Sequence, residues 1–411
     1  MRLDRYDSYL TNFHAHVAEV RTDANGTWVR LDRSAFYPHA GGQPHDVGEL
    51  EAAGARLRVI DVRAPADDEV WHLLDLDGAT ANATGLRPGT PVVGAIDWPR
   101  RWRHMQRHSA QHLLSAALIR VNAAFGTLAV SMRGPDCTIE IAGEFGEAHL
   151  AAVEAEANLV ARRNLPIDAF EVDESRLGDY DLRRPSKVGG IVRLVAIGQY
   201  DIVACGGTHL RSTAEALPIK LLGYERVRGG NTRITFRAGV EALDDYGAKH
   251  AWVTHLGRLF SVPAGELRGR AERLLADLAA AKREAADWRE RVATGLAEGL
   301  ASTGSNPLVA VLEGADADLL TELMDACQKQ AGCVALLGAA NGGHAQLAFI
   351  AGPGAGVDVR PLLADALTAL GGRGGGRADR AQGAAEADPG RVREVLEAVA
   401  NGLRGGWTHV R

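Results

Sequence analysis

The sequence predicts an α+β protein of several domains, and three observations support this prediction. The chain has 411 residues, which is enough for two to four domains that each bury a core. Short runs of alternating apolar and polar residues precede residue 95, and apolar residues at helical spacing begin near residue 97. The predicted domains are a small β-barrel, an α+β domain, a helical hairpin or coiled coil, and an α/β domain, covering residues 1–95, 96–240, 241–303 and 304–411.

The composition is that of an ordinary globular protein. Hydrophobic residues make up 46% and charged residues 24% of the chain, which excludes wholesale disorder. The formal net charge of −6 argues against indiscriminate coating of nucleic acid but leaves room for a local basic patch. Four cysteines form no disulfide framework, and neither a signal peptide nor a membrane span is visible. We therefore expect a cytoplasmic protein that does not enter a membrane.

The first domain is expected to be β-rich. The runs HAHVAEVRT, TWVRLDR, RLRVIDVRA and EVWHLLDL are separated by glycine, proline and Asn-Gly turns. Short strands at this spacing are typical of a small barrel or sandwich. The loop at residues 36–44 contains too much glycine and proline to be regular structure.

The second domain is expected to place helices against a sheet. Apolar residues from Trp102 to Val121 recur at helical spacing, and a second helix is expected from Glu147 to Asn164. The runs IVRLVAI and TRITFRA are expected strands. Arginines interrupt the first helix, which fits either an anionic partner or a solvated face; they are Arg100, Arg101, Arg103 and Arg107.

Residues 241–303 carry a heptad seam, and Pro263 interrupts the helical pattern before it. A helical hairpin or a dimer-forming coiled coil fits this pattern. The seam steps by four and three through Leu267, Ala271, Leu274, Leu278, Ala281, Ala285, Trp288 and Val292.

The last domain alternates strands and helices, and a glycine run at residues 371–377 is expected to open its final helical segment. The run lacks the Lys-Ser/Thr that ends a P-loop, which argues against a nucleotide site. Arg373 and Arg377 project from this run. They suit contacts with nucleic-acid phosphates, or they belong to a mobile surface loop.

A metal site is indicated by two separate motifs. His108 and His112 stand four residues apart in an expected helix and so project from one face. Cys205 and His209 add a thiolate and a third imidazole on a glycine-opened turn. This donor set suits Zn²⁺. Four protein ligands would make a structural site and three ligands plus water a hydrolytic one, and spacing does not choose between them.

These motifs resemble those of the alanyl-tRNA editing proteins (the AlaX family), which are relatives of the editing domain of alanyl-tRNA synthetase. The matching segments are YLTNF at residues 9–13, FYP…GGQ at 36–43, HSAQHLL at 108–114 and CGGTH at 205–209. The seam helix and the segment 371–382 resemble the C-terminal domain of that synthetase, as in the long form of the family. The pairing of H-x-x-x-H with C-G-G-T-H is the most specific part of the resemblance.

The resemblance implies a zinc-dependent deacylase acting in trans on tRNA(Ala) that carries serine or, less surely, glycine. Because the barrel begins at the N-terminus, no aminoacylation domain is expected before it. Zinc is expected on His108, His112, Cys205 and His209. The expected substrate contacts are Ser34 and Gln43, as polar groups that recognise the serine hydroxyl, and Thr208. The expected tRNA contacts are Arg101, Arg103, Arg107, Arg373 and Arg377.

The chain departs from the family pattern at several positions. His39-Ala40 replace the usual Glu-Gly, Ser34 replaces a threonine, and TAEA at 213–216 replaces TGEI. These changes bear on the pocket and hence on the choice between serine and glycine. A non-catalytic tRNA-binding factor with a structural zinc, as a monomer or a homodimer, is the alternative function. A phosphodiesterase is disfavoured because the Asp-His-His motif is absent.

Overall fold

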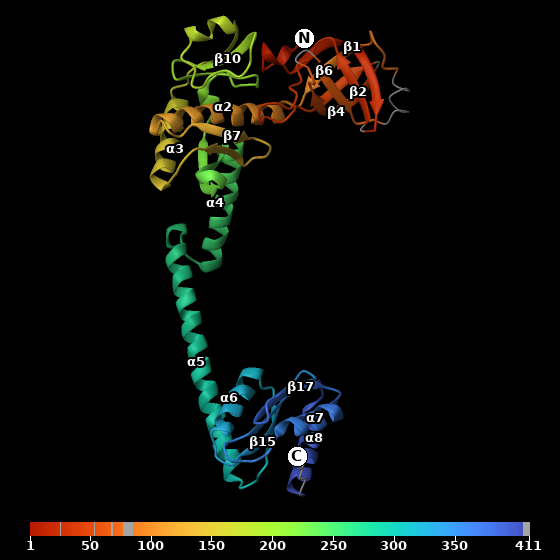
Figure 1. Cartoon of the computed structure of the whole chain (residues 1–411), viewed down its shortest axis with the longest axis vertical. Coiled ribbons are helices and arrows are strands. Elements are labelled where there is room, and N and C mark those ends of the chain that lie inside the picture. Colours follow the sequence, from red (N-terminus) through yellow and green to blue (C-terminus); the bar gives the residue numbers. More distant parts are fainter. Residues whose placement is uncertain (25, 53, 67–68, 77–84, 406–411) are drawn as a thin grey trace. The chain divides into compact units, whose positions relative to one another are not determined.

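The structure is a computed structural model that describes residues 1–24, 26–52, 54–66, 69–76 and 85–405. The chain forms two compact units, residues 1–255 and 256–411 (Figure 1). The predicted α+β class is confirmed, with a barrel at the N-terminal end and a mixed sheet at the C-terminal end. The four predicted domain boundaries stay a prediction.

The first unit begins with a closed six-stranded barrel in the order β1-β2-β5-β4-β3-β6. All its neighbouring strands are antiparallel, and β1 closes the barrel on β6. Alternate residues of β1 point into a core that contains Phe13, Leu50 and Val59. The strands are β1 (Asn12–Asp23), β2 (Gly26–Leu31), β3 (Gly48–Ala52), β4 (Ala55–Arg63), β5 (Trp71–Leu74) and β6 (Pro91–Ile96).

The long helix α2 (Trp98–Val121) follows the barrel directly and leads from it into the rest of the unit (Figure 1). Asp97 caps the helix by accepting a hydrogen bond from the Arg100 backbone N–H at 3.1 Å, and Pro99 suits its first turn. The helix therefore starts four residues before the expected Trp102. Nearly every side chain from Arg101 to Leu118 is buried, so the arginine-rich face is not simply solvated.

Two sheets and a second helix pack around α2. The strands β7 (Thr127–Ser131), β8 (Cys137–Ile141), β12 (Ile219–Val227) and β13 (Asn231–Ala238) form a sheet in the order β12-β13-β8-β7. A smaller sheet has the order β11-β10-β9, with β9 (Ile167–Asp173), β10 (Ile191–Ile197) and β11 (Asp201–Ala204). Helix α3 (Glu147–Arg162) ends before the expected Asn164, which adopts a left-handed φ of 53°. Leu113, Leu114 and Phe236 lie in the shared core.

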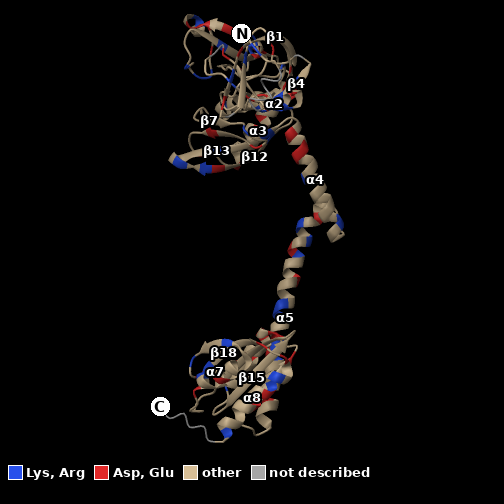
Figure 2. Cartoon of the chain, turned by 90° about the vertical axis from the view of Figure 1, so that its right-hand side faces the viewer, with Lys and Arg blue, Asp and Glu red and all other residues tan. Residues whose placement is uncertain are grey.

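Two helices follow these sheets along the chain: α4 (Val240–Phe260) and α5 (Leu267–Ser302). Charges of both signs are spread along α5 (Figure 2), and Arg268 pairs with Glu272 one turn later at 2.9 Å. The seam residues Leu278 and Trp288 are 53% and 56% exposed, so the seam is not covered by the described part of this chain. No described helix is long and apolar enough to span a membrane.

The second unit ends in a five-stranded sheet with the order β14-β15-β16-β18-β17. Only β14 and β15 among these are parallel. The end of α5 packs on this unit through Ala293 and Ala297. The elements are β14 (Leu308–Glu313), α6 (Ala317–Gln328), β15 (Val334–Asn341), β16 (His344–Ala351), α7 (Val359–Leu370), β17 (Arg373–Gly376), β18 (Arg380–Glu386) and α8 (Pro389–Arg404).

The sequence suggested that the glycine run at residues 371–377 opens a helical segment or forms a mobile loop. In the structure, residues 373–376 of this run form the edge strand β17 instead. A Cβ on Gly374 would overlap the backbone of β18 and approach Leu367 of α7. Close packing of this strand against β18 and α7, rather than flexibility, therefore explains the glycines. Arg373 stays exposed on the edge, while Arg377 lies 3.6 Å from the Asp379 carboxylate.

Candidate metal centre

The fold brings together the four residues of the two histidine and cysteine motifs. His108 and His112 lie one turn apart on α2, and Cys205 and His209 lie on the loop after β11. One potential ligand atom from each residue lies within 4.8 Å of the others, so the four could hold a metal ion. Both nitrogen–sulfur distances from Cys205 Sγ, to Nε2 of His108 and to Nε2 of His209, are 3.4 Å.

Burial and mutual proximity set the protonation of this cluster. Burial, reinforced by neighbouring positive groups, lowers the pKa of His112 and of His209 well below the usual value. Burial alone would raise the pKa of the Cys205 thiol, but His108 and His209 hold it well below its usual value. The arrangement therefore favours neutral His112 and His209 beside a Cys205 thiolate, and neutral imidazole and thiolate are the forms that bind a metal ion.

Hydrogen bonds from neighbouring side chains orient two of the three rings. Gln43 Oε1 lies 2.7 Å from Nδ1 of His108, and Ser109 Oγ lies 3.2 Å from Nδ1 of His209. The Gln43 amide also donates to Thr208 Oγ1 at 2.8 Å. Nδ1 of His112 is buried and has no hydrogen-bond partner among the described residues. Partners of this kind orient metal-binding histidines in proteins.

The second glycine of the C-G-G-T-H motif makes room for the cluster. A Cβ on Gly207 would overlap the ring of His108 and would lie 3.0 Å from Gln43 Oε1, whereas a Cβ on Gly206 would meet nothing within 4 Å. Of these two positions, only 207 therefore requires a glycine, because the His108 ring lies too close to its backbone for a Cβ.

Two buried arginines that brace the site were not assigned this role from the sequence. Arg193 of β10 donates from Nη1 to the carbonyl oxygens of Cys205 and Gly207, both at 2.9 Å. Arg101 of α2 is fully buried and pairs with Asp46, which also accepts from the Tyr37 backbone N–H at 2.7 Å. The Arg193 contacts hold the loop that carries Cys205 and His209, and the Arg101 contacts hold the loop at residues 36–46. A charged residue inside the apolar run IVRLVAI was the one available signal for Arg193.

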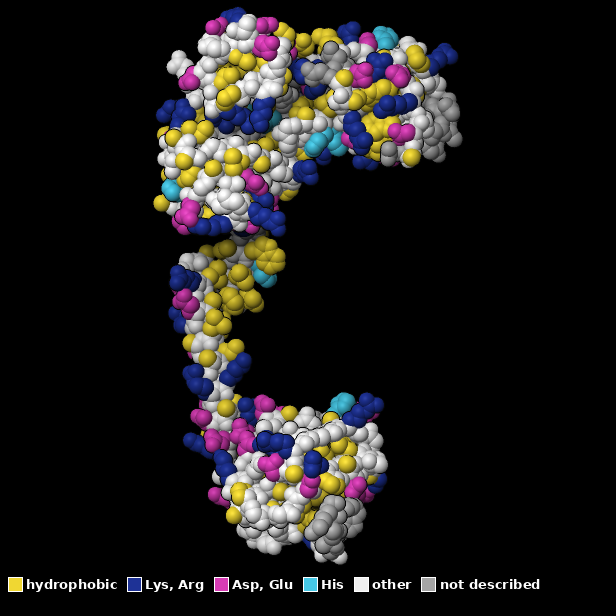
Figure 3. Space-filling model, in the orientation of Figure 1, with side chains coloured by type: hydrophobic (Ala, Val, Ile, Leu, Met, Phe, Trp, Pro, Cys, Tyr) yellow, Lys and Arg dark blue, Asp and Glu magenta, His cyan; other side chains and the backbone are white. Residues whose placement is uncertain are grey.

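A pocket of about 460 Å³ opens beside the cluster. Among the described residues, its wall includes His108, His112 and Cys205 together with Gln111 and residues 127–130. Gln111 donates to Ser115 Oγ at 2.7 Å, which lies 2.7 Å from Thr127 Oγ1. Figure 3 shows basic side chains gathered between the β10 sheet and α2, and Arg183 and Arg184 line this pocket.

The other residues singled out from the sequence have various positions. Ser34 is buried in the barrel, 2.8 Å from Nε2 of His72, and is not part of the pocket wall. Gln43 and Thr208 are buried behind the metal ligands. Arg107 is buried and pairs with Glu241. Of the three α2 arginines expected to contact tRNA, only Arg103 is exposed.

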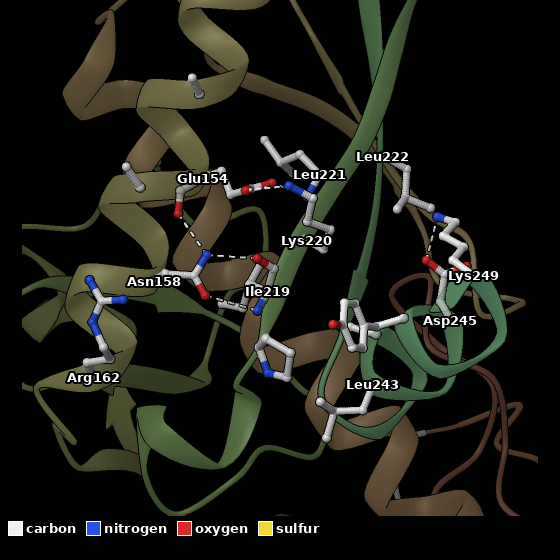
Figure 4. Close-up of a pocket in the computed structure, with 15 residues that line it drawn as sticks. Glu154, Asn158, Arg162, Ile219, Lys220, Leu221, Leu222, Leu243, Asp245 and Lys249 are labelled. Carbon is white, nitrogen blue, oxygen red and sulfur yellow. Dashed lines mark hydrogen bonds and ion pairs between the residues drawn. The ribbon is translucent and has the colours of Figure 1, made fainter. Parts of the chain in front are cut away.

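A different cavity of about 770 Å³ lies between α3, β12 and α4 and shares no residue with the metal pocket (Figure 4). Its polar groups are bonded to one another. Asn158 is hydrogen-bonded to both the N–H and the C=O of Ile219, and Glu154 pairs with Lys220 at 2.7 Å. This cavity therefore offers neither a metal ligand set nor a reactive group of the kind found on α2.

Three family models match the chain. The threonyl and alanyl tRNA synthetase second additional domain matches residues 192–235, the class II (A) tRNA synthetases match residues 9–100, and the DHHA1 domain matches residues 304–404. Two of these three models describe segments of tRNA synthetases, and the matched residues lie in the barrel and around the C-G-G-T-H loop. The matched second additional domain contains Cys205 and His209.

Individual relatives narrow this class. The chain is 31% identical over 407 residues to the alanine–tRNA ligase of Thermococcus kodakarensis, covering 96% of this chain and 42% of the relative. It is 31% identical over 393 residues to that of Frankia alni, covering 92% and 43%. Over most of its length the chain is therefore similar to the alanine–tRNA ligases, which agrees with the resemblance of its motifs to the alanyl-tRNA editing proteins, and it spans less than half the length of these relatives.

One solved structure is also similar to part of the chain. It is the C-Ala domain of the Aquifex aeolicus alanyl-tRNA synthetase, at 23% identity and a TM-score of 0.21. The similarity covers 23% of this chain and 86% of that structure.

Proposed function

We propose that the protein is a zinc-dependent hydrolase that removes serine, and also glycine, from wrongly charged tRNA(Ala) in the cytoplasm. The observation that carries this proposal is the His/Cys cluster on the wall of a pocket, in a chain related to alanyl-tRNA synthetases. The substrate is an ester between the amino acid and the terminal ribose, and hydrolysis needs no ATP.

The donor set fits zinc. With Zn–N bonds of about 2.0 Å and Zn–S bonds of about 2.3 Å, tetrahedral zinc keeps a nitrogen and a sulfur ligand roughly 3.5 Å apart. The 3.4 Å separations of Cys205 Sγ from His108 and His209 match this spacing without rearrangement. Zinc held by these residues and His112 would supply positive charge next to the ester carbonyl.

The chain's own residues are proposed to position the substrate. Gln43 and Thr208 hold His108 in place from behind, so they act through the metal ligand rather than on the substrate. Ser34 is too deep in the barrel for a substrate contact. Gln111, instead of Ser34 and Gln43, is proposed to recognise the serine hydroxyl. Its amide nitrogen donates to Ser115, so its carbonyl oxygen is left to accept a hydrogen bond from a hydroxyl in the pocket. A site that hydrogen-bonds the serine hydroxyl disfavours the correct alanyl ester, because alanine has no hydroxyl and the polar group of the site would then stay unpaired.

The terminal nucleotide is proposed to lie along the arginine side of the pocket. Arg183 is bonded to Asp201 at 2.8 Å and is held in place, whereas Arg184 is exposed and forms no ion pair within the described ranges. Exposed arginine beside a small pocket suits a phosphate next to the aminoacylated ribose.

Release of free serine from Ser-tRNA(Ala) tests the proposal directly. We expect release from Ser-tRNA(Ala) and Gly-tRNA(Ala), little from Ala-tRNA(Ala), loss on chelation and recovery on adding Zn²⁺. The second candidate, a non-catalytic tRNA-binding factor with a structural zinc, is favoured by the closed set of four protein donors. It predicts tRNA binding with no serine release at any metal concentration.

A further inference from the structure

A third cavity, of about 670 Å³, lies along the first turns of α2. We call it the arginine groove, defined by Arg58, Arg100, Arg103 and Arg133 around His104. Altogether six arginines and three acidic residues line it. Two of these arginines are neutralised in ion pairs, since Arg107 pairs with Glu241 and Arg237 with both Asp136 and Asp245.

The four defining arginines form no ion pair with any described residue. Arg58, Arg103 and Arg133 are exposed, and Arg100 uses only Nε, in a 3.1 Å hydrogen bond to the His45 carbonyl. The groove therefore keeps an excess of positive charge, because these four arginines face only two carboxylates outside ion pairs, Asp97 and Asp244. Such a surface attracts anions.

His104 supplies an independent observation that points to a ligand. Its side chain is 4% exposed, it lines the groove, and its buried Nδ1 has no hydrogen-bond partner in the described part of the chain. Burial, with Arg100 and Arg107 nearby, lowers the pKa of His104 to about 3, so the ring is neutral. A buried unpaired ring nitrogen is costly unless a bound group completes its hydrogen bonds.

The groove adjoins the metal pocket. His104 precedes the ligand His108 by one helical turn, about 6 Å along the axis. The same chain segment passes from β7, which lines the metal pocket, to residues 133–135, which line the groove. The two cavities are separated where the Met132 backbone N–H donates to Gly42 at 3.2 Å and Arg107 donates to the Met132 carbonyl at 3.1 Å.

We propose that the arginine groove binds the sugar–phosphate backbone of the RNA whose aminoacylated end enters the metal pocket. This inference rests on the proposed function for the identity of the RNA. Phosphates lie against Arg58, Arg100, Arg103 and Arg133, and the ring of His104 hydrogen-bonds one phosphate or ribose oxygen. The contacts are to the backbone and carry no base information.

The test measures binding of an uncharged acceptor-stem hairpin of tRNA(Ala) by fluorescence anisotropy at several salt concentrations. The double variant Arg103→Gln/Arg133→Gln is expected to bind roughly tenfold more weakly and to have a salt slope smaller by between about 1 and 2. The matched control is Arg162→Gln, which removes an exposed arginine of the other cavity and is expected to bind like the wild type. Equal affinity and slope in the double variant, or an equal loss in the control, would overturn the proposal.

A third variant separates the hydrogen bond from the charge. His104→Phe is expected to weaken hairpin binding about threefold with an unchanged salt slope, because a neutral ring displaces no counterion. Unchanged affinity would remove His104 from the site. Zinc content, measured on every variant, shows that the fold is kept.

Serine release, measured in parallel, distinguishes the two proposals. If the wild type releases no serine but the double variant still loses hairpin affinity, RNA binding in the arginine groove is supported and the hydrolase function is contradicted. If the double variant releases serine with an unchanged KM, the hydrolase function is supported and RNA binding in the arginine groove is contradicted.

Discussion

Gln43 Oε1 lies 2.7 Å from Nδ1 of His108, which ties the loop at residues 36–46 to the metal cluster on α2. The same amide donates to Thr208 on the opposite loop, so one buried side chain connects both halves of the site. We therefore expect Gln43→Leu to weaken zinc binding about 10- to 100-fold. Competition with a chelating dye measures the affinity. Gln199→Leu, at an exposed position, is the control, and equal affinities in both variants would contradict this role for Gln43.

Adjacent glycines provide a matched pair. Gly207→Ala places a methyl group against the ring of His108, so we expect loss of bound zinc and of serine release. Gly206→Ala meets nothing and should keep both. Metal content by atomic absorption and serine release are measured on the two proteins. Equal zinc content in both variants would show that the loop can shift away from His108.

Loss of a ligand should abolish activity together with metal content. We expect Cys205→Ala and His112→Ala to lose zinc and to release serine from Ser-tRNA(Ala) at no more than the uncatalysed rate. His14→Ala, at an exposed barrel position, should match the wild type. Turnover at the wild-type rate in a zinc-free ligand variant would exclude a role for the metal in hydrolysis.

Replacement of Gln111 tests the choice of amino acid. Gln111→Leu removes the proposed acceptor for the serine hydroxyl, so we expect kcat/KM for Ser-tRNA(Ala) to fall by about 10- to 100-fold. Hydrolysis of Gly-tRNA(Ala), which offers no hydroxyl, should change much less. Equal losses for both substrates would assign Gln111 to the pocket's shape instead.

The barrel should lose stability in acid because of His72. Burial lowers the pKa of His72 to about 4, below the value near 6.5 of an unfolded chain. Protons therefore bind preferentially to the unfolded state as the pH falls below 6.5. Neutral His72 contributes about 3 kcal/mol to the free energy of unfolding at neutral pH, and this stabilisation is lost between pH 6.5 and 4. Urea unfolding of zinc-free protein, followed by tryptophan fluorescence at pH 7.0, 5.5 and 4.5, measures the loss. His72→Asn should lose less stability over this range, and equal losses would contradict the assignment.

The sequence predicted the parts of the structure that depend on local pattern. Period-two runs predicted the barrel strands, and the helices expected from Trp102 to Val121 and from Glu147 to Asn164 correspond to α2 and α3. The helix α2 begins before the first apolar residue of the helical pattern, because Asp97 caps it and Pro99 suits its first turn. Gly374 was interpreted as flexible, since sequence alone does not reveal that a neighbouring strand lies too close for a Cβ.

The candidate site was predictable in its donors but not in its surroundings. Identity of side chain and spacing suffice to select His108 and Cys205, because few residue types bind metal. The roles of Arg101 and Arg193 depend on contacts with residues far away in the chain, such as Asp46 and Cys205. An arginine that braces a loop and one that binds a phosphate look the same in a sequence.

His108 and Cys205 are separated by 97 residues, yet both belong to one cluster. On the ribosome, a nascent chain cannot assemble that cluster until His209 has left the exit tunnel, although the barrel is already complete. An ion would thus be captured only after the barrel has been made, when about half of the chain has been synthesised. Scarcity of the ion during translation would leave α2 and the C-G-G-T-H loop without their common cross-link, and the newly made protein would be more accessible to proteases at that loop.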